Sequence, residues 1–217
     1  MTDIHDQLAN AHRELRNSRI PAGELRTVLL RRTYDAPIED VWEACTDPER
    51  IKRWFLPVTG DLRLGGSYQL EGNAGGEIVR CEPPRVLKVT WRSGEDPTAP
   101  GLSEVELRLS AGAAGRTVLE LEHAATVDPD WWARYGPGAV GVGWDLTLLG
   151  LGLHLRNESI GDLSAWEQSS EAKEFIVGSS DAWRVAHEAA GATHTEASTA
   201  SEYTAAFYAP DTGTPAT

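Results

Sequence analysis

The feature that most constrains this chain is its longest apolar stretch, residues 136–161, with the sequence GPGAVGVGWDLTLLGLGLHLRNESIG. Its first half alternates apolar with small or polar residues, as a half-buried strand does. The alternation ends at Leu149, however, and the stretch is far longer than a usual strand of about 5–6 residues. Leucine dominates, Pro137 stands at the start and Gly161 follows the end, as at helix termini. The sequence therefore predicts a long apolar helix near residues 138–158.

On a helical wheel of about 100° per residue, this helix has two bulky apolar stripes with small or polar residues between them. The stripes are Val140, Trp144, Leu148, Leu151 and Leu155, and Val142, Leu146, Leu149 and Leu153. Between them on one side lie Asp145 and Arg156, which we expect to face water. The opposite side carries Gly143, Thr147, Gly150 and His154. This groove of small residues permits close packing against a sheet, which the pattern favours, or space for a guest molecule.

The charge balance limits the partners of the chain. Its 20 basic residues stand against 33 acidic ones, a net charge of −13. Nucleic acids and anionic membranes both require basic surface, so neither is expected as a partner. The N-terminal sequence MTDIHDQLANAHREL lacks the basic start and apolar core of a signal peptide, and every long apolar stretch contains a charge. We therefore expect a cytoplasmic protein.

Residue types that mark metal or cofactor chemistry are sparse. Cys45 and Cys81 have no metal-ligand spacing and are expected to be reduced, buried thiols. No nucleotide-binding fingerprint and no nucleophile elbow is present, and the histidines are too scattered for a metal site. The acidic residues that alternate along the predicted strands are typical of a solvated face. The sequence predicts no metal and no cofactor.

The rest of the chain predicts an α+β protein. Apolar residues at helical spacing indicate an amphipathic helix over residues 3–18, carried by Ile4, Leu8, Ala11 and Leu15. A strand over 24–34 is followed by two short helices that Pro57 ends. Strands are then expected over 61–64, 67–71, 77–82, 86–91, 104–109 and 119–123, separated by Gly-rich or Pro-Pro turns. A polar loop, 93–101, interrupts this antiparallel series.

This order of elements predicts an antiparallel sheet of six or seven strands that curves around the long helix. We divide the chain into an N-terminal helix (1–21), a main domain (22–161) and a C-terminal helical extension with a disordered end (162–217). The extension predicts two further helices, anchored by residues such as Phe175, Trp183 and Phe207. They are expected to cover the main domain within the same chain; the alternative is a homodimer contact through the terminal helices.

Four segments of the chain resemble a known family. They are TYDAPIEDVWEACTDPERIKRWF, LRLGGSY, GGEIVRCEPPRVLKVTW and GWDLTLLGLGLHL, in this order over residues 26–156. They are similar to the START-like (SRPBCC) superfamily, specifically its activator-of-heat-shock-protein-ATPase-like branch. The resemblance implies a helix-grip fold with a cavity between sheet and helix. Members include carriers of hydrophobic ligands, polyketide cyclases or aromatases, and chaperone regulators, so the function must be argued from the site.

The candidate site residues are those expected to face such a cavity. His123 shares the phase of Leu119 and Leu121 and should point inward, either as a core residue or as a polar group of the cavity. The full set of candidates is Trp54, Phe55, Tyr68, Trp91, His123, Gly143, Thr147, Gly150 and His154.

Three functions follow from these candidates. The first, which we favour, is non-enzymatic binding of an apolar small molecule. The second is a cyclase-type enzyme that uses His123 or His154 to transfer protons. The third is regulation of a chaperone ATPase, for which the extra partner-binding domain of the eukaryotic regulators is missing.

Overall fold

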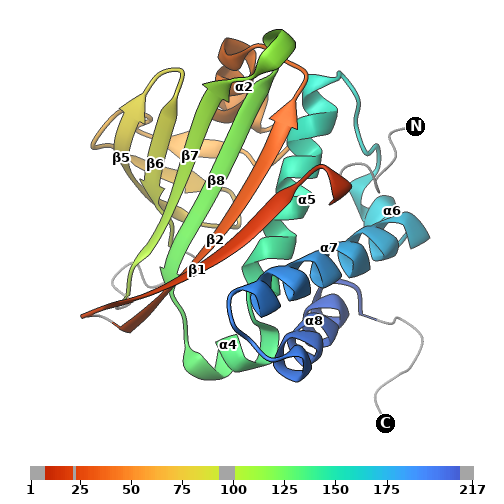
Figure 1. The fold of residues 1–217 in the computed structure, drawn as a ribbon. Coiled ribbons are helices and arrows are strands. Elements are labelled where there is room, and N and C mark those ends of the chain that lie inside the picture. Colours follow the sequence, from red (N-terminus) through yellow and green to blue (C-terminus); the bar gives the residue numbers. More distant parts are fainter. Residues whose placement is uncertain (1–7, 22, 93–100, 211–217) are drawn as a thin grey trace.

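In the computed structural model, residues 8–21, 23–92 and 101–210 are described (Figure 1). The strands are β1 (His12–Ile20), β2 (Gly23–Tyr34), β3 (Val58–Gly60), β4 (Ser67–Leu70), β5 (Gly75–Glu82), β6 (Val86–Thr90), β7 (Ser103–Ala111) and β8 (Thr117–Thr126). The helices are α2 (Ile38–Thr46), α3 (Pro48–Ile51), α4 (Pro129–Tyr135), α5 (Gly138–Leu155), α6 (Leu163–Glu167), α7 (Ser170–Ala189) and α8 (His194–Tyr208). A short 3-10 turn at Ala113–Gly115 joins β7 to β8.

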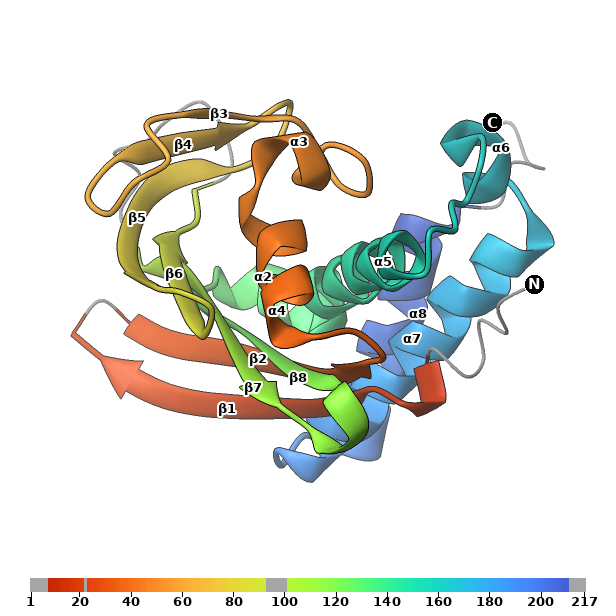
Figure 2. The same ribbon diagram turned by 90° about the horizontal axis from the view of Figure 1, so that it is seen from above.

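All the strands form one antiparallel sheet in the order β1-β2-β8-β7-β6-β5-β4-β3. The sheet curves around α2, α3 and α5, which lie in its concave side (Figure 2). This confirms the predicted α+β class and helix-grip architecture. The sheet has eight strands rather than six or seven, however. The difference arises chiefly at the N-terminus of the chain.

The first strand, β1, replaces part of a predicted helix. Residues 1–7 of that helix lie outside the described residues, but His12–Ile20 pair along their whole length with β2. Leu15 lies opposite Val28, and both side chains are buried. Arg13, Glu14, Leu15 and Arg16 of β1 are good helix formers, but propensity is a weak prior that pairing with the open edge of β2 overrides. The predicted N-terminal helix is therefore wrong over residues 12–20.

The long helix is confirmed, and the sheet holds it. Helix α5 ends at Leu155, three residues before the predicted end, and its side chains Val142, Leu148 and Leu151 are almost fully buried. The Tyr34 hydroxyl from β2 donates a hydrogen bond to the Leu148 carbonyl oxygen, at 3.0 Å. Helix α5 is also long and apolar enough to cross a membrane. The core helix of a soluble protein meets the same two criteria, and half of α5 is buried in the protein. Its apolarity is thus explained by its place in the core.

One face of α5 contradicts the wheel. Asp145, expected in water, is only 1% exposed. Arg13 from β1 donates two hydrogen bonds to its carboxylate, at 2.8 and 3.0 Å, and Ser179 and Trp183 from α7 donate one each, at 2.6 and 3.0 Å. Burying a carboxylate is costly unless it is paired and hydrogen-bonded, as it is here. The wheel failed because helix α7 covers this face; Arg156 is exposed, as expected.

The C-terminal extension packs on the main domain within the same chain. Helix α7 lies against α5 and β1, and α8 lies against α4 and α7 (Figure 1). The Tyr208 hydroxyl of α8 donates to the Ala139 carbonyl oxygen of α5, at 2.7 Å. The first of the two predicted helices is divided into α6 and α7, since Ser169 caps a new helix by accepting from the Ala172 amide. The predicted disordered end, from residue 211 on, lies outside the described residues.

Two smaller predictions also need comment. Residues 61–64 are not a strand; β3 lies just before them, at Val58–Gly60, where the chain pairs with β4. The strand is displaced because Asp61 and Gly66 close a tight turn in which an added side chain at Gly66 would overlap the Asp61 carbonyl oxygen. Most of the predicted polar loop, residues 93–100, lies outside the described residues.

Candidate functional site

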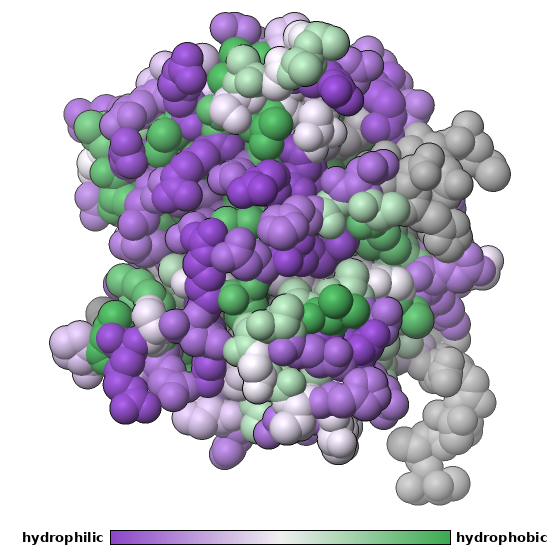
Figure 3. Space-filling view, in the orientation of Figure 1, coloured by the Kyte–Doolittle hydropathy of each residue, from purple (hydrophilic) through white to green (hydrophobic). Residues whose placement is uncertain are grey.

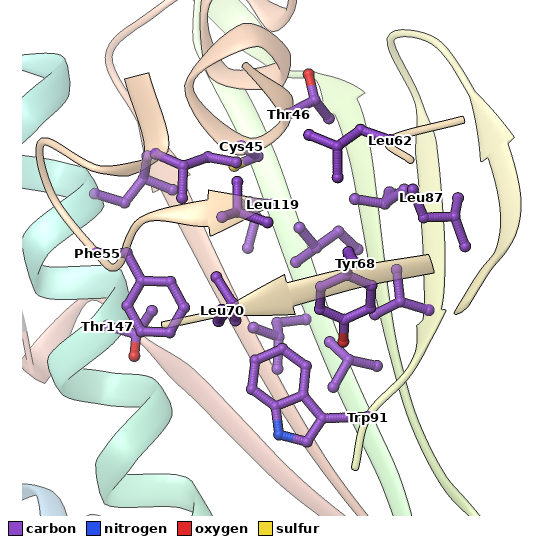
Figure 4. A pocket seen from close by; sticks show the side chains of 18 of the residues that line it. Cys45, Thr46, Phe55, Leu62, Tyr68, Leu70, Leu87, Trp91, Leu119 and Thr147 are labelled. Atoms are coloured by element: carbon purple, nitrogen blue, oxygen red, sulfur yellow. The ribbon is translucent and has the colours of Figure 1, made fainter. Parts of the chain in front are cut away.

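An apolar cavity of about 180 Å³ lies between the concave face of the sheet and α5, beneath α2 and α3 (Figure 4). We call it the inner cavity. Its lining is almost entirely apolar: Cys45, Thr46, Ile51, Trp54, Phe55, Val58, Leu62, Arg63, Tyr68, Leu70, Ile78, Cys81, Leu87, Val89, Trp91, Val105, Leu107, Leu119, Leu121, Trp144, Thr147, Leu148 and Leu151. The strands contribute alternate residues such as Val105, Leu107, Leu119 and Leu121, which point inward because side chains alternate along a strand.

The polar atoms of the inner cavity are already engaged or chemically quiet. The Tyr68 hydroxyl donates to the Thr90 carbonyl oxygen, at 2.8 Å, and burial raises its pKa. Burial raises the pKa of the Cys45 thiol to about 12, so it is no nucleophile at neutral pH. Cys45 and Cys81 are free, as predicted, but only half-buried rather than buried. Both cysteine side chains line the inner cavity, so part of each faces the cavity rather than other side chains.

A second, wider pocket of about 640 Å³ adjoins the first, and we call it the outer cleft. Its lining is more polar: Phe55, Asn73, Trp91, Arg92, Gly101, Leu102, Ser103, His123, Ala125, Thr126, Ala139, Val140, Gly143, Trp144, Thr147 and Tyr208. Phe55, Trp91, Trp144 and Thr147 line both spaces. These four side chains, which we call the partition, therefore lie where the apolar inner cavity meets the more polar outer cleft.

Aromatic rings dominate this partition and the inner cavity beside it. The ring centroids of Trp91 and Trp144 are 5.0 Å apart, and Tyr68 lies 6.5 Å from Trp91. Trp54 stacks on Phe55 with centroids 5.7 Å apart. Such separations are typical of favourable aromatic pairs. A flat apolar guest would thus meet ring faces or edges from the sheet and from α5.

His123 is fixed in one protonation state beside the partition. Its Nδ1 accepts a hydrogen bond from the Trp144 indole N–H, at 3.1 Å, and its Nε2 lies 3.0 Å from the Ser103 Oγ. Because an indole nitrogen only donates, Nδ1 carries no proton, so Nε2 carries it and donates to Ser103. Burial lowers the pKa of His123 to about 4, so the ring is neutral at physiological pH.

A third pocket of about 680 Å³ lies on the other side of α5, near α6 and the end of α8. Its lining includes Trp54, Gly150, Trp166, Ile176 and Tyr208. At Gly150 the helix approaches the loop after α3 closely: an added Cβ would lie 2.7 Å from the Trp54 carbonyl oxygen. The glycine is therefore required here for close packing of α5 against this loop.

The nine candidates from the sequence are divided among these spaces. Trp54, Phe55, Tyr68, Trp91 and Thr147 line the inner cavity, His123 and Gly143 line the outer cleft, and Gly150 lines the third pocket. His154 lines none of the pockets described. Burial and the nearby Arg50 and Arg53 of the α3 region lower its pKa. It lies one turn too far along α5, where the helix has left the cavity. The binding role of the other eight stays a prediction.

Two residues that matter here were not among the candidates. Trp144 was placed in an apolar stripe, and nothing in the sequence indicates that its indole N–H meets His123. Ser103 shares the inward phase of Val105, which was a signal that could have identified it. In the part of the chain that the structure describes, no three or more His, Cys, Asp or Glu side chains gather as metal ligands would.

Comparisons with known proteins agree with the architecture. The family model for activator of Hsp90 ATPase homolog 1-like protein matches residues 35–155. The crystal structure of CalU16 from Micromonospora echinospora is 42% identical, covers 82% of this chain and 98% of CalU16, and has a TM-score of 0.64. The solution structure of the same protein is 41% identical, with 83% and 97% covered and a TM-score of 0.67.

A more distant likeness supports the fold alone. DynU16, from the dynemicin biosynthetic locus, is 24% identical, with a TM-score of 0.52 over 60% of this chain and 47% of DynU16. No curated protein matches the chain.

Proposed function

This chain belongs to the family of activator of Hsp90 ATPase homolog 1-like proteins, and we propose that it binds an apolar small molecule between its sheet and its long helix. The observation that carries the proposal is the pairing of the inner cavity with the outer cleft across one aromatic partition. The family includes more than one activity, so the proposal rests on these spaces rather than on membership.

The sizes of the two spaces suit a guest that occupies both. The inner cavity, about 180 Å³, is comparable to an engineered apolar cavity of about 150 Å³ that binds benzene. It is smaller than the about 300–1,000 Å³ of pockets for drug-sized ligands, a range into which the outer cleft of about 640 Å³ falls. An apolar group would enter the inner cavity while the polar end of the same molecule stays in the outer cleft.

The contacts of His123 favour binding over catalysis. A general base needs an unprotonated nitrogen that faces the substrate and a pKa near the working pH. Here Nδ1 accepts from Trp144, and Nε2–H donates to Ser103. The pKa of about 4 makes the ring a weak base. Ser103 therefore lacks the proton acceptor that a serine nucleophile requires.

Regulation of a chaperone ATPase is the activity named in the family description. No contact or surface of the described residues specifically favours such a partner over a small molecule. We therefore propose ligand binding in the cytoplasm as the function. A direct assay of chaperone ATPase stimulation would test the alternative.

The proposal is tested by filling the inner cavity. We would titrate wild type, Cys81→Phe and Val79→Phe with N-phenylnaphthylamine, a neutral dye whose fluorescence rises in apolar surroundings. A neutral dye avoids repulsion by the net charge of −13. Cys81 lines the cavity, whereas Val79 of the same strand is 39% exposed on the surface. We expect saturable binding to wild type and Val79→Phe, and affinity weakened about tenfold or more in Cys81→Phe, a loss of about 1.4 kcal/mol.

A second filling variant guards against a folding defect. Overpacking costs typically about 1–3 kcal/mol, so the melting temperature of each variant is measured first. Cys45→Leu fills the same space from α2, on another wall. Wild type that shows no saturable binding, or two stable filling variants that bind like wild type, would contradict the proposal.

A further inference from the structure

We propose that the Ser103 hydroxyl donates a hydrogen bond to the guest, and that the guest is an aromatic compound with a carbonyl oxygen. The inference rests on the proposed function and specifies the chemistry of its ligand. Two observations support it. The first is a series of hydrogen bonds in which the donor and the acceptor of each bond are determined. The second is that the other hydroxyl groups of the outer cleft donate to backbone carbonyl oxygens.

The chain of hydrogen bonds runs from α5 to the sheet. The Trp144 indole donates to His123 Nδ1, at 3.1 Å, and His123 Nε2–H therefore donates to Ser103 Oγ, at 3.0 Å. Ser103 Oγ is thus the acceptor in this pair, so its own proton is directed elsewhere. A hydroxyl that accepts a hydrogen bond is polarised and becomes a better donor. Its side chain lines the outer cleft, where a guest would receive that proton.

The other hydroxyl groups that the described residues place in the outer cleft donate to the backbone. Tyr208 donates to the Ala139 carbonyl oxygen at 2.7 Å, Thr147 to that of Gly143 at 2.8 Å, and Thr126 to that of Leu102 at 3.4 Å. Ser103 differs, since it is the acceptor in its side-chain hydrogen bond with His123. It is the hydroxyl whose proton is available to a ligand.

The surroundings of Ser103 define the rest of the guest. Trp91 and Trp144, whose ring centroids are 5.0 Å apart, border the same cleft and suit a planar aromatic ring. A single hydroxyl donor is satisfied by a neutral acceptor such as a carbonyl oxygen. The net charge of −13 opposes the approach of an anionic guest, although Arg92 lines the same cleft. An aromatic ketone or quinone therefore suits the two tryptophan rings and the Ser103 hydroxyl together.

The experiment compares two probes that differ in the acceptor alone. The first is prodan, a naphthalene with propionyl and dimethylamino groups, whose emission shifts to the red when its carbonyl accepts a hydrogen bond. The second is the same compound with a propyl group in place of propionyl. Each is titrated into wild type, Ser103→Ala, Ser103→Thr, which keeps the hydroxyl, and Ser110→Ala, a control at an exposed position of the same strand β7.

We expect Ser103→Ala to weaken prodan binding roughly three- to tenfold, the worth of one hydrogen bond, and to shift bound emission to the blue. Ser103→Thr and Ser110→Ala should bind prodan like wild type, and the propyl compound should not distinguish the variants. Ser103→Ala that binds prodan unchanged, or weakens both probes equally, would overturn this inference while leaving the proposed function intact. Wild type that binds neither probe would overturn both.

Discussion

At the scale of single residues, the account depends on what each polar side chain does once it is buried. His123 is 8% exposed, and Asp145 is 1% exposed. Asp145 carries a structural pairing that ties β1, α5 and α7 together through Arg13, Ser179 and Trp183. His123 instead stands between the core and the outer cleft, and its neutral state orients Ser103. Burial thus serves stability in the first case and, in our proposal, ligand recognition in the second.

The neutrality of His123 predicts a pH dependence of stability. Its pKa is about 4 in the folded protein and about 6.5 when unfolded, so the unfolded chain binds the proton more readily. The stabilising contribution is complete above pH 6.5 and is lost as the pH falls toward 4. The expected loss is on the order of 3 kcal/mol. We would measure the free energy of unfolding in urea between pH 7 and pH 4 for wild type and His123→Gln.

The comparison removes the contribution of other groups. Burial also lowers the pKa of His154 and His187, and both proteins share that effect. Wild type should therefore lose more unfolding free energy than His123→Gln as the pH falls from 7 to 4. A stability difference between the two proteins that stays constant over this range would show that His123 titrates alike in both states.

At the scale of elements, the sequence predicts most where pattern and environment coincide. The inward residues of β7 and β8 alternate along each strand, and α5 combines length, leucine content and terminal Pro and Gly. These signals are local. Strand β1 and the burial of Asp145 depend on tertiary context instead: β1 needs the open edge of the sheet at β2, and Asp145 needs α7 to cover that face of α5. The cavity follows the same rule, since the lining of a space depends on how several elements converge.

The small residues of α5 illustrate this limit. The wheel groups Gly143, Thr147 and Gly150 on one face, yet Thr147 borders all three large pockets while Gly150 meets the Trp54 backbone. Close packing and cavity lining are therefore both present along a single stripe. The element that packs against each turn of α5 decides which applies: α8 at Gly143 and the loop after α3 at Gly150.

Gly150→Ala tests the close approach. The added Cβ would lie 2.7 Å from the Trp54 carbonyl oxygen, a backbone atom that cannot move cheaply. We expect the overpacking cost of about 1–3 kcal/mol to exceed the helix-propensity gain of about 0.8–1.0 kcal/mol. Gly178→Ala on α7 is the matched control, since its Cβ would meet only the end of the Leu8 side chain. Urea unfolding should show a loss for Gly150→Ala and a gain for Gly178→Ala; a gain in both would mean that the approach near Trp54 is loose.

At the scale of the whole molecule, the C-terminal extension contributes to the pockets of the helix-grip domain. Tyr208, from the end of α8, borders both the outer cleft and the third pocket. The face that carries β1 and α7 is largely hydrophilic with scattered apolar patches (Figure 3). Exposed aromatic side chains also occur, among them Trp131, Tyr203 and Phe207 of α4 and α8. Our proposal that an apolar compound binds in the spaces beside α5 must therefore be tested against binding to this exposed cluster.

The most direct test of the central claim uses the eight tryptophans as position markers. We would record the indole N–H resonances of ¹⁵N-labelled protein during a titration with naphthalene, assigning them by single Trp→Phe substitutions. Trp54, Trp91 and Trp144 line the inner cavity, whereas Trp131 is 44% exposed on α4 and Trp183 is buried beside Asp145. The account predicts saturable shifts of the first three resonances, with those of Trp131 and Trp183 unchanged. Shifts confined to Trp131, or no saturable shift of any resonance, would contradict it.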